Sequence, residues 1–276
     1  MTAEVDGRRN GVNYETIILE KKDRIATITM NRPERLNATT VQMEEDLNNV
    51  FIDVAEDDGV RVVVLTGAGR GFCSGEDVKE RPGETPGWRK PSQDITNPVT
   101  HGNRMILALR NITKPVIAAV NGAAVGQGLS LCLHSDIRIA SENARLGAVW
   151  TLRGIPPESF SAYILPQIVG IPKAIELVFT GRIIDAREAK EIGLVTGVYP
   201  ADRFAEATDK LAGQIARGAP IALALAKKAI YQFPNAFLDA AMQLERFSLD
   251  YANKTEDREE GIRSFLEKRE ADFQGR

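Results

Sequence analysis

This sequence has few cysteines and little net charge. Among its 276 residues there are only two cysteines, Cys73 and Cys132. They lie far apart in apolar runs, which fits neither a zinc site nor a disulfide framework, so we expect no metal and a reducing, cytoplasmic compartment. Lysine and arginine number 35, and aspartate and glutamate 38, which gives a formal net charge of -3. So small a charge gives no reason to expect a nucleic-acid partner.

Long apolar runs are absent as well. Residues 1–13 carry scattered charges and have no apolar centre, so they resemble neither a secretory signal nor a membrane span. We expect a flexible tail there. The chain is 43% hydrophobic and 26% charged, as is usual for folded globular proteins. Its length allows one large domain, or a core with a helical extension.

Strand and helix patterns alternate in the first part of the chain. Thr16 to Leu19 and Ile25 to Met30 predict a hairpin, because apolar and polar residues alternate in the second run. Apolar residues at helical spacing from Met43 to Val54 predict a helix. Further patterns predict a helix over 103–110 and strands over 62–65, 116–120 and 136–140. This alternation predicts an α/β core over residues 14–200.

The last part of the chain, residues 201–276, shows no strand pattern. Apolar residues recur there at helical spacing, from Phe204 to Phe265, and predict helices. Helices alone seldom carry so much apolar surface without a partner, so we expect this region to pack on a second copy. The charged run Glu256 to Glu260 fits a solvated helix face.

Two glycine-containing stretches follow predicted strands and could present backbone donors. Gly75 precedes Glu76 and Asp77 in a turn whose N–H groups could point into a cleft. Gly126 precedes Gln127 at the start of an apolar helix, where N–H groups lack intrahelical partners. One donor from each stretch would make an oxyanion hole. The same glycines could instead serve only the close packing of helix on strand.

A third stretch ends in a carboxylate. Glu158 follows Pro157 at the predicted start of a helix, where an acid that only caps the helix would stabilise it by about 0.5 to 1 kcal/mol. A dinucleotide site at Gly67 and Gly69 is disfavoured, because the third glycine position falls on Phe72 and no amphipathic helix begins there.

Several segments match one known pattern in order and spacing. They span about residues 14–273 and are Asn31 to Ala38, Phe72 to Lys79, Lys114 to Gly122, Ser135 to Ala140, Phe179 to Arg182, Ala189 to Val195 and Glu260 to Arg269. Together they resemble the crotonase (enoyl-CoA hydratase/isomerase) superfamily.

The resemblance implies an α/β fold in which repeated ββα units form a spiral and C-terminal helices build trimers or hexamers. It implies an acyl-CoA thioester as substrate and no other cofactor, with the thioester oxygen bound by the N–H groups of Glu76 and Gln127. Around these donors it implies substrate contacts from Gly75, Asp77, Gly126, Ser130, Trp150 and Pro157. For CoA it implies Arg35, Leu36 and Ala38, with Phe265 and Lys268 contributed by a neighbouring copy.

This sequence departs from the family's hydratases at both of their glutamates. Ser130 and Trp150 occupy those places, and neither is a base near neutral pH, so a simple hydratase is disfavoured. Glu158 stands eight residues past Trp150, where the resemblance implies Glu in Δ3,Δ2-enoyl-CoA isomerases and Asp in phenylacetate-pathway and dienoyl-CoA isomerases. The leading hypothesis is therefore an isomerase in which Glu158 shuttles a proton between two carbons.

Two alternatives stay open. The spacing from Trp150 to Glu158 also resembles 4-chlorobenzoyl-CoA dehalogenases, whose added histidine aligns near Asn103, two positions from His101. Glu158 would then be a nucleophile or base in a hydratase, hydrolase or dehalogenase for an aromatic or cyclic acyl-CoA. In that case Trp150 would form a wall of the acyl pocket, donate a hydrogen bond from its indole N–H, or be only a core aromatic. The other alternative is a homologue that binds acyl-CoA without catalysis.

The remaining polar residues and the acyl pocket complete the expectations. His134 and Cys132 lie on an apolar helix and are expected in the core. The segment Arg81 to Pro98, rich in proline and glycine, is expected to be a functional or mobile loop. We expect the acyl group to be held by the region 81–103 together with the pocket around Trp150.

Overall fold

In the computed structural model the described residues are 14–79, 101–232 and 237–275. The tail predicted over 1–13 and the loop over 81–98 lie outside these ranges. Some side chains inside the helices are also outside the description, among them that of His101.

The main sheet contains six strands in the order β1-β2-β3-β5-β7-β10 and is parallel except for the β1–β2 hairpin. The strands are β1 (Ile17–Lys22), β2 (Ile25–Met30), β3 (Val62–Gly67), β5 (Val116–Val120), β7 (Ile137–Ser141) and β10 (Gly197–Tyr199). Along β2 buried residues alternate with half-buried ones, which confirms the predicted period of two.

A second sheet of three-residue strands lies beside the main one. Its strands are β4 (Gly71–Cys73), β6 (Ala123–Val125), β8 (Arg145–Gly147) and β9 (Ile183–Asp185). Strands this short show no period, so the sequence patterns missed them. Each of β4, β6 and β8 follows a strand of the main sheet and is followed by a helix. This repeat matches the predicted spiral of ββα units.

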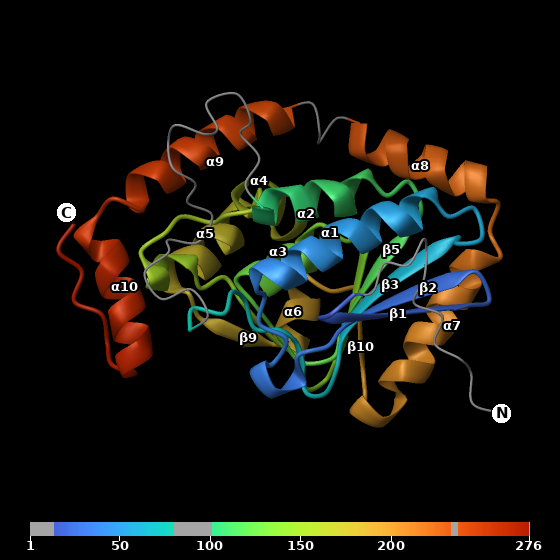
Figure 1. Ribbon diagram of the computed structural model, residues 1–276, viewed down its shortest axis with the longest axis horizontal. Helices are drawn as coiled ribbons and strands as arrows, with labels where there is room; N and C mark the ends of the chain where they lie inside the picture. Colours follow the sequence, from blue (N-terminus) through green and yellow to red (C-terminus); the bar gives the residue numbers. More distant parts are fainter. Residues whose placement is uncertain (1–13, 80–100, 233–236, 276) are drawn as a thin grey trace.

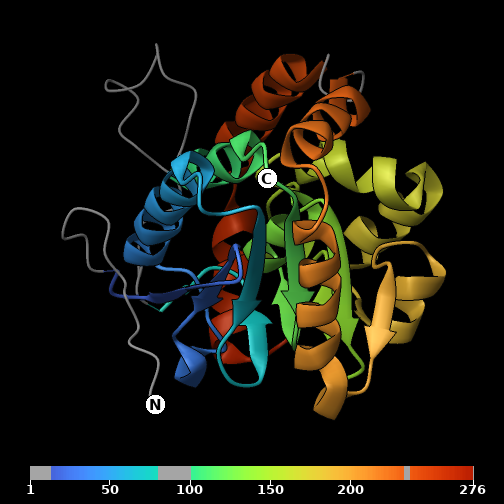
Figure 2. The same ribbon diagram turned by 90° about the vertical axis from the view of Figure 1, so that its right-hand side faces the viewer.

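Helices cover both faces of the main sheet (Figures 1 and 2). On one face α1 (Val41–Glu56) and α2 (His101–Asn111) pack against each other. On the other, α7 (Phe204–Ala216) packs on β2, β3 and β7. Helix α1 begins where the Thr40 hydroxyl accepts a hydrogen bond from the Met43 N–H at 3.1 Å. The apolar residues that predicted this helix are all buried: Met43, Leu47, Val50, Phe51 and Val54.

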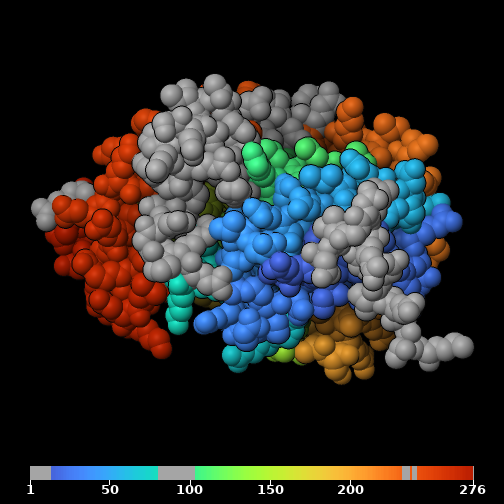
Figure 3. Space-filling view, viewed as in Figure 1, coloured from blue at the N-terminus to red at the C-terminus, as the bar shows by residue number. Residues whose placement is uncertain are grey.

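The remaining helices surround the second sheet and form the C-terminal part. They are η1 (Pro33–Arg35), α3 (Gln127–Leu133), η3 (Trp150–Arg153), α4 (Ser161–Val169), α5 (Ile171–Thr180), α6 (Ala186–Glu191), η4 (Ala201–Arg203), α8 (Pro220–Gln232), α9 (Leu238–Ala252) and α10 (Glu256–Glu267). Helix α9 packs on α4 (Figure 1), and contacts also join α10 to η3. The C-terminal residues occupy one end of the face shown in Figure 3.

Large apolar side chains of α8 and α9 are exposed. They are Ile221, Leu225, Ile230, Leu244, Phe247 and Tyr251, each more than 60% exposed. A surface of this kind suits a protein partner. The trimer or hexamer, and the division of the chain at residues 200 and 201, stay predictions. Within the described ranges, no helix is long and apolar enough to cross a bilayer.

Candidate active site

The two glycine stretches converge. Gly75 has a φ of +98°, and a Cβ there would lie 3.0 Å from the Val125 carbonyl oxygen and 3.8 Å from the Gln127 nitrogen. Gly126 has a φ of +54°, and a Cβ there would lie 3.9 Å from the Cα of Gly75. Residues with side chains rarely adopt such φ values, so both positions favour glycine. The backbone leading to Glu76 therefore lies against the backbone leading to Gln127.

Hydrogen bonds from neighbouring strands fix both stretches. The Thr39 N–H donates to the Gly75 carbonyl at 2.8 Å, and the Asp77 N–H donates to the Thr39 carbonyl at 2.9 Å. The Gly126 N–H donates to the Gly147 carbonyl at 3.1 Å. Because Gln127 is the first residue of α3, its N–H lies outside the intrahelical hydrogen-bond pattern.

The predicted CoA segment adjoins the Gly75 stretch. The Ser74 N–H donates to the Leu36 carbonyl at 3.1 Å, and the Ser74 hydroxyl donates to the Arg35 carbonyl at 3.2 Å. The Arg32 guanidinium donates to the Ala38 carbonyl at 2.7 Å and forms an ion pair with buried Asp77 at 3.2 Å. Arg35 is exposed, and Ala38 is buried. Hydrogen bonds therefore hold this segment against the predicted oxyanion stretch.

Glu158 lies on a turn before α4 and is half-buried together with Pro157. The N-cap of α4 is Phe160, so Glu158 is not the capping acid that one interpretation suggested. Ser159 and Phe160 have φ values of 55° and 58°, in the left-handed region. Each such residue costs on the order of 1 to 3 kcal/mol, so the surrounding structure has to hold this turn.

Helix α3 holds the Glu158 turn through side chains. The Ser159 hydroxyl donates to Gln127 Oε1 at 3.0 Å. The hydroxyls of Ser130 and Ser161 are 2.9 Å apart, and both side chains are fully buried. The helix that begins with a predicted oxyanion donor thus also fixes the residues beside the predicted acid.

His134, at the end of α3, makes a further bond to the turn. Its Nε2 lies 2.6 Å from the Ser159 carbonyl oxygen, and its Nδ1 lies 3.1 Å from Arg110. A guanidinium only donates, so Nδ1 accepts and Nε2–H donates to Ser159. Burial, together with the Arg110 charge, lowers the His134 pKa to about 3, and the ring stays neutral. The predictions that His134 and Cys132 are core residues are confirmed.

Helix α9 contributes a buried carboxyl that no sequence pattern indicated. Glu245 Oε2 accepts a hydrogen bond from the Phe160 N–H at 2.6 Å. Burial, the larger cause, and the charge of Glu158 raise the Glu245 pKa to about 8. Glu245 is 85 positions away from Phe160, and only the packing of α9 on α4 brings them together.

Helix α10 places a cation close to the predicted site. Arg258 is buried and donates to the Arg153 carbonyl at 2.8 Å. Burial lowers the Arg258 pKa, whereas the charges of Glu76 and Glu158 raise it, so its guanidinium lies within electrostatic reach of both. The prediction of a solvated face over 256–260 is wrong at Arg258 and Glu260, which are buried because α10 packs on η3.

The remaining residues predicted for the site are Trp150, Phe265 and Lys268. Trp150 begins η3 and is 2% exposed, and its Nε1 has no hydrogen-bond partner among the described residues. The Arg153 guanidinium stacks over the Phe265 ring of the same chain, 4.0 Å from the ring centroid. Lys268 ends α10 and is exposed.

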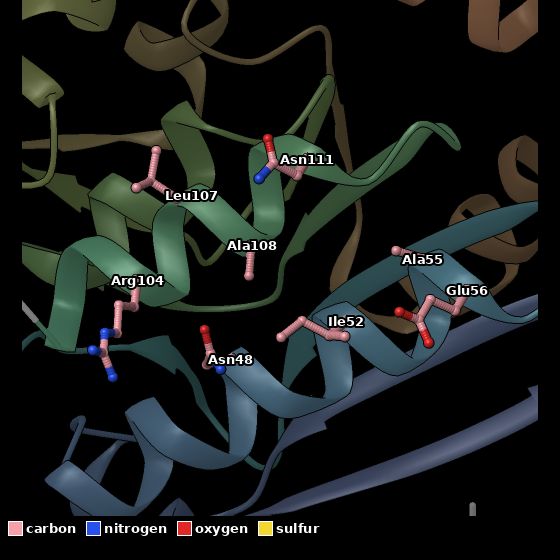
Figure 4. A pocket seen from close by; sticks show the side chains of 8 residues that line it. All are labelled: Asn48, Ile52, Ala55, Glu56, Arg104, Leu107, Ala108 and Asn111. Atoms are coloured by element: carbon pink, nitrogen blue, oxygen red, sulfur yellow. The ribbon is translucent and has the colours of Figure 1, made fainter. Parts of the chain in front are cut away.

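A groove between α1 and α2 is separate from these residues (Figure 4). Its volume is about 380 Å³, and it contains none of the predicted site residues. It is lined by Asn48, Ile52, Ala55, Glu56, Arg104, Leu107, Ala108 and Asn111. Over the described part of the chain, no cluster of three His, Cys, Asp or Glu side chains could hold a metal ion.

The chain is similar to known enzymes along most of its length. A family model described as enoyl-CoA hydratase/isomerase matches residues 20–276. The 1,2-epoxyphenylacetyl-CoA isomerase of Escherichia coli is 34% identical, over 81% of this chain and 84% of its own. The short-chain-enoyl-CoA hydratase of Clostridium acetobutylicum is 35% identical, over 94% of this chain and 97% of its own.

A solved structure is also similar to this chain. The enoyl-CoA hydratase/isomerase from Pseudoalteromonas atlantica matches with a TM-score of 0.84 and 31% identity, over 94% of this chain and 100% of its own. The predicted α/β crotonase-type fold is thereby confirmed. The chain belongs to the enoyl-CoA hydratase/isomerase family of the crotonase superfamily.

Proposed function

We propose that this enzyme is an enoyl-CoA isomerase that moves a double bond within an acyl-CoA, with Glu158 as the proton shuttle. The observation that carries the proposal is the hydrogen bond from Ser159 to Gln127, at 3.0 Å. It ties the residue next to Glu158 to the residue whose N–H is the predicted oxyanion donor. A base and an enolate-stabilising group are the two parts that a double-bond shift requires.

The reaction would proceed through an enolate. The Glu158 carboxylate accepts a proton from the carbon beside the thioester of a 3-enoyl-CoA. The electron pair moves onto the thioester oxygen, which the N–H groups of Glu76 and Gln127 stabilise. Glu158 then returns the proton two carbons away, and the double bond moves from C3–C4 to C2–C3.

Substrate binding is assigned to the surface around these groups. Arg35, Leu36 and Ala38 adjoin the Gly75 stretch and would contact CoA, with Phe265 and Lys268 reaching it from a neighbouring copy in a trimer or hexamer. Trp150 lies on η3 and Ser130 on α3, and Pro157 directly precedes Glu158. The acyl-CoA is the substrate, and no other cofactor is needed for this chemistry.

The test is Glu158→Gln, assayed on 3-enoyl-CoA substrates. Positioned acid–base groups typically contribute about 10² to 10⁴ in rate, so we expect kcat to fall by that factor while KM changes little. Glu259→Gln, at an exposed position of α10, is the matched control and should behave as the wild type. Full turnover by Glu158→Gln would remove Glu158 from the mechanism.

A second candidate is the addition of water to an aromatic or cyclic acyl-CoA, or its hydrolysis or dehalogenation. It is favoured by the second carboxyl, Glu245, near Glu158, and by the hydratase among the relatives. Single turnover in H₂¹⁸O separates the cases, because an isomerase incorporates no label into its product. Label in the Glu158 carboxylate would instead indicate a covalent ester.

A protein that only binds acyl-CoA would behave differently from both enzymes. It would bind the thioester tightly but exchange no acyl hydrogen with solvent deuterium. Exchange catalysed at the carbon beside the thioester would exclude this third possibility.

A further inference from the structure

A buried carboxyl on the C-terminal helices contacts the turn that carries Glu158. Glu245 is 7% exposed, and its Oε2 accepts the Phe160 N–H. Its Oε1 is buried and has no hydrogen-bond partner of ordinary geometry in the described ranges. Burying a carboxyl group is unfavourable, so packing of α9 alone does not explain an acid at this position.

We propose that Glu245 is a positioning residue for Glu158: from α9 it holds the Ser159–Phe160 turn, and its burial keeps this carboxyl neutral in the working enzyme. The inference rests on the proposed function in taking Glu158 as the acid–base group. No bond to substrate is assigned to Glu245.

The geometry of the turn is the first support. Both residues after Glu158 have left-handed φ values, which are unfavourable unless neighbouring groups stabilise them. Helix α3 holds the Ser159 hydroxyl and carbonyl, through Gln127 and His134. Glu245 accepts the N–H on the other side of the same peptide group, that of Phe160. Contacts from two separate helices thus fix both polar atoms of the Ser159–Phe160 peptide group, next to Glu158.

The charge around Glu245 is the second support. Burial raises the Glu245 pKa most, and the Glu158 charge raises it further, whereas the N–H groups of Phe160 and Ser159 and the Asn103 side chain lower it. The result is a pKa of about 8, so near neutral pH Glu245 keeps its proton. Above that pH a second negative charge enters a buried space.

Other charged or titratable side chains come from the elements packed around the turn. They are Arg110 on α2, His134 on α3, Tyr163 on α4, Arg246 on α9 and Arg258 on α10. His134 is neutral because its pKa is lowered to about 3, and Arg246 is paired with Asp250 at 3.9 Å. The charge of Glu158 raises the Arg258 pKa, so the Arg258 guanidinium lies within electrostatic reach of Glu158.

The test compares Glu245→Ala with Glu245→Gln by kcat and KM on both sides of pH 8. Glutamine is neutral and keeps an oxygen for the Phe160 N–H, whereas alanine leaves that N–H without its acceptor. Loss of positioning can cost up to about 10²-fold, so we expect Glu245→Ala to lower kcat about 10- to 100-fold with little change in KM. Glu245→Gln should recover much of this loss and should lack the fall in activity that we expect of the wild type as pH rises through 8. Glu259→Gln serves as the control on an exposed acid.

Three kinetic outcomes would overturn the proposal. These are unchanged kcat in Glu245→Ala, a loss in Glu245→Gln as large as in Glu245→Ala, and an unaltered alkaline limb in Glu245→Gln. If Glu245→Ala does not fold, the pH profile of Glu245→Gln decides alone. Hydrogen exchange of the Phe160 amide and the pH dependence of the unfolding midpoint report on Glu245 without any assay of turnover. These two measurements therefore distinguish failure of this proposal from failure of the isomerase assignment. Faster Phe160 exchange in folded Glu245→Ala supports the proposal, and unchanged exchange in that variant contradicts it.

Discussion

The Ser159 hydroxyl donates a hydrogen bond to Gln127 Oε1 at 3.0 Å, and both residues are buried. Through this bond the start of α3 and the turn after Glu158 form one unit. The base and the oxyanion donors of the proposed reaction therefore depend on the same small set of side chains. Several consequences can be measured.

Ser159→Ala should weaken the link between α3 and the Glu158 turn. Loss of a typical hydrogen bond costs about 0.5 to 1.5 kcal/mol, and buried Gln127 Oε1 would lose its donor. We expect a lower unfolding free energy by that amount and a lower kcat, measured by urea denaturation and steady-state kinetics. Ser248→Ala is the control, because its exposed hydroxyl donates to the Leu244 carbonyl of its own helix. Equal effects of the two variants would contradict the role of Ser159.

Gly75→Ala should separate the two converging glycine stretches. The new Cβ would lie 3.0 Å from the Val125 carbonyl oxygen at a φ of +98°, and such strain costs about 1 to 3 kcal/mol. A displaced oxyanion donor lowers kcat by about 10² to 10³, which kinetics on acyl-CoA would show. Gly213→Ala, in α7, has open space around its Cβ and should be neutral or slightly stabilising. Normal kcat in Gly75→Ala would count against an oxyanion hole here.

His134 should make the protein less stable in acid. Its pKa in the folded protein is about 3, below the value of 6.5 for an unperturbed histidine. The unfolded chain therefore binds a proton first, and the unfolding free energy falls as pH drops below 6.5, by up to about 1.4 kcal/mol per pH unit. His134→Gln removes this contribution, so its stability should fall less in acid than that of the wild type. Parallel curves of unfolding midpoint against pH would refute the prediction.

Glu245 should act on stability in the opposite direction. Its pKa is raised from 4.5 to about 8, so the folded protein holds a proton that the unfolded chain releases. The unfolding free energy should then decrease as pH rises from 4.5 to 8, again by up to about 1.4 kcal/mol per unit. The difference between wild type and Glu245→Gln, followed by urea denaturation, isolates this contribution. An identical slope in both proteins would show that Glu245 is ionised in the fold.

The two thiols should be unreactive in the native protein. Cys73 and Cys132 are fully buried, and burial raises the pKa of Cys73 to about 12 and that of Cys132 further. The thiolate is the reactive form, so a thiol reagent at pH 8 should label neither before unfolding. Denatured protein should give two labelled thiols per chain. Fast labelling of the native protein would mean that these core positions open readily.

The sequence by itself determined the parts of this protein that depend on neighbours within a few positions. Alternation along β2 and the helical spacing from Met43 to Val54 specify which faces are buried. Gly75 and Gly126 mark where the backbone needs a positive φ, which few other residues adopt. The family pattern added the place of Glu158.

Only the tertiary structure decided which distant groups meet. Glu245 lies 85 positions from Phe160 and Ser159 lies 32 from Gln127, and no local pattern encodes such pairs. The same holds for Arg258, which looked like part of a solvated run and is buried where α10 packs on η3. The physical reason is desolvation. Whether a charged side chain is exposed, paired or protonated depends on which groups the fold packs against it. The residues beside it in the chain do not specify those groups.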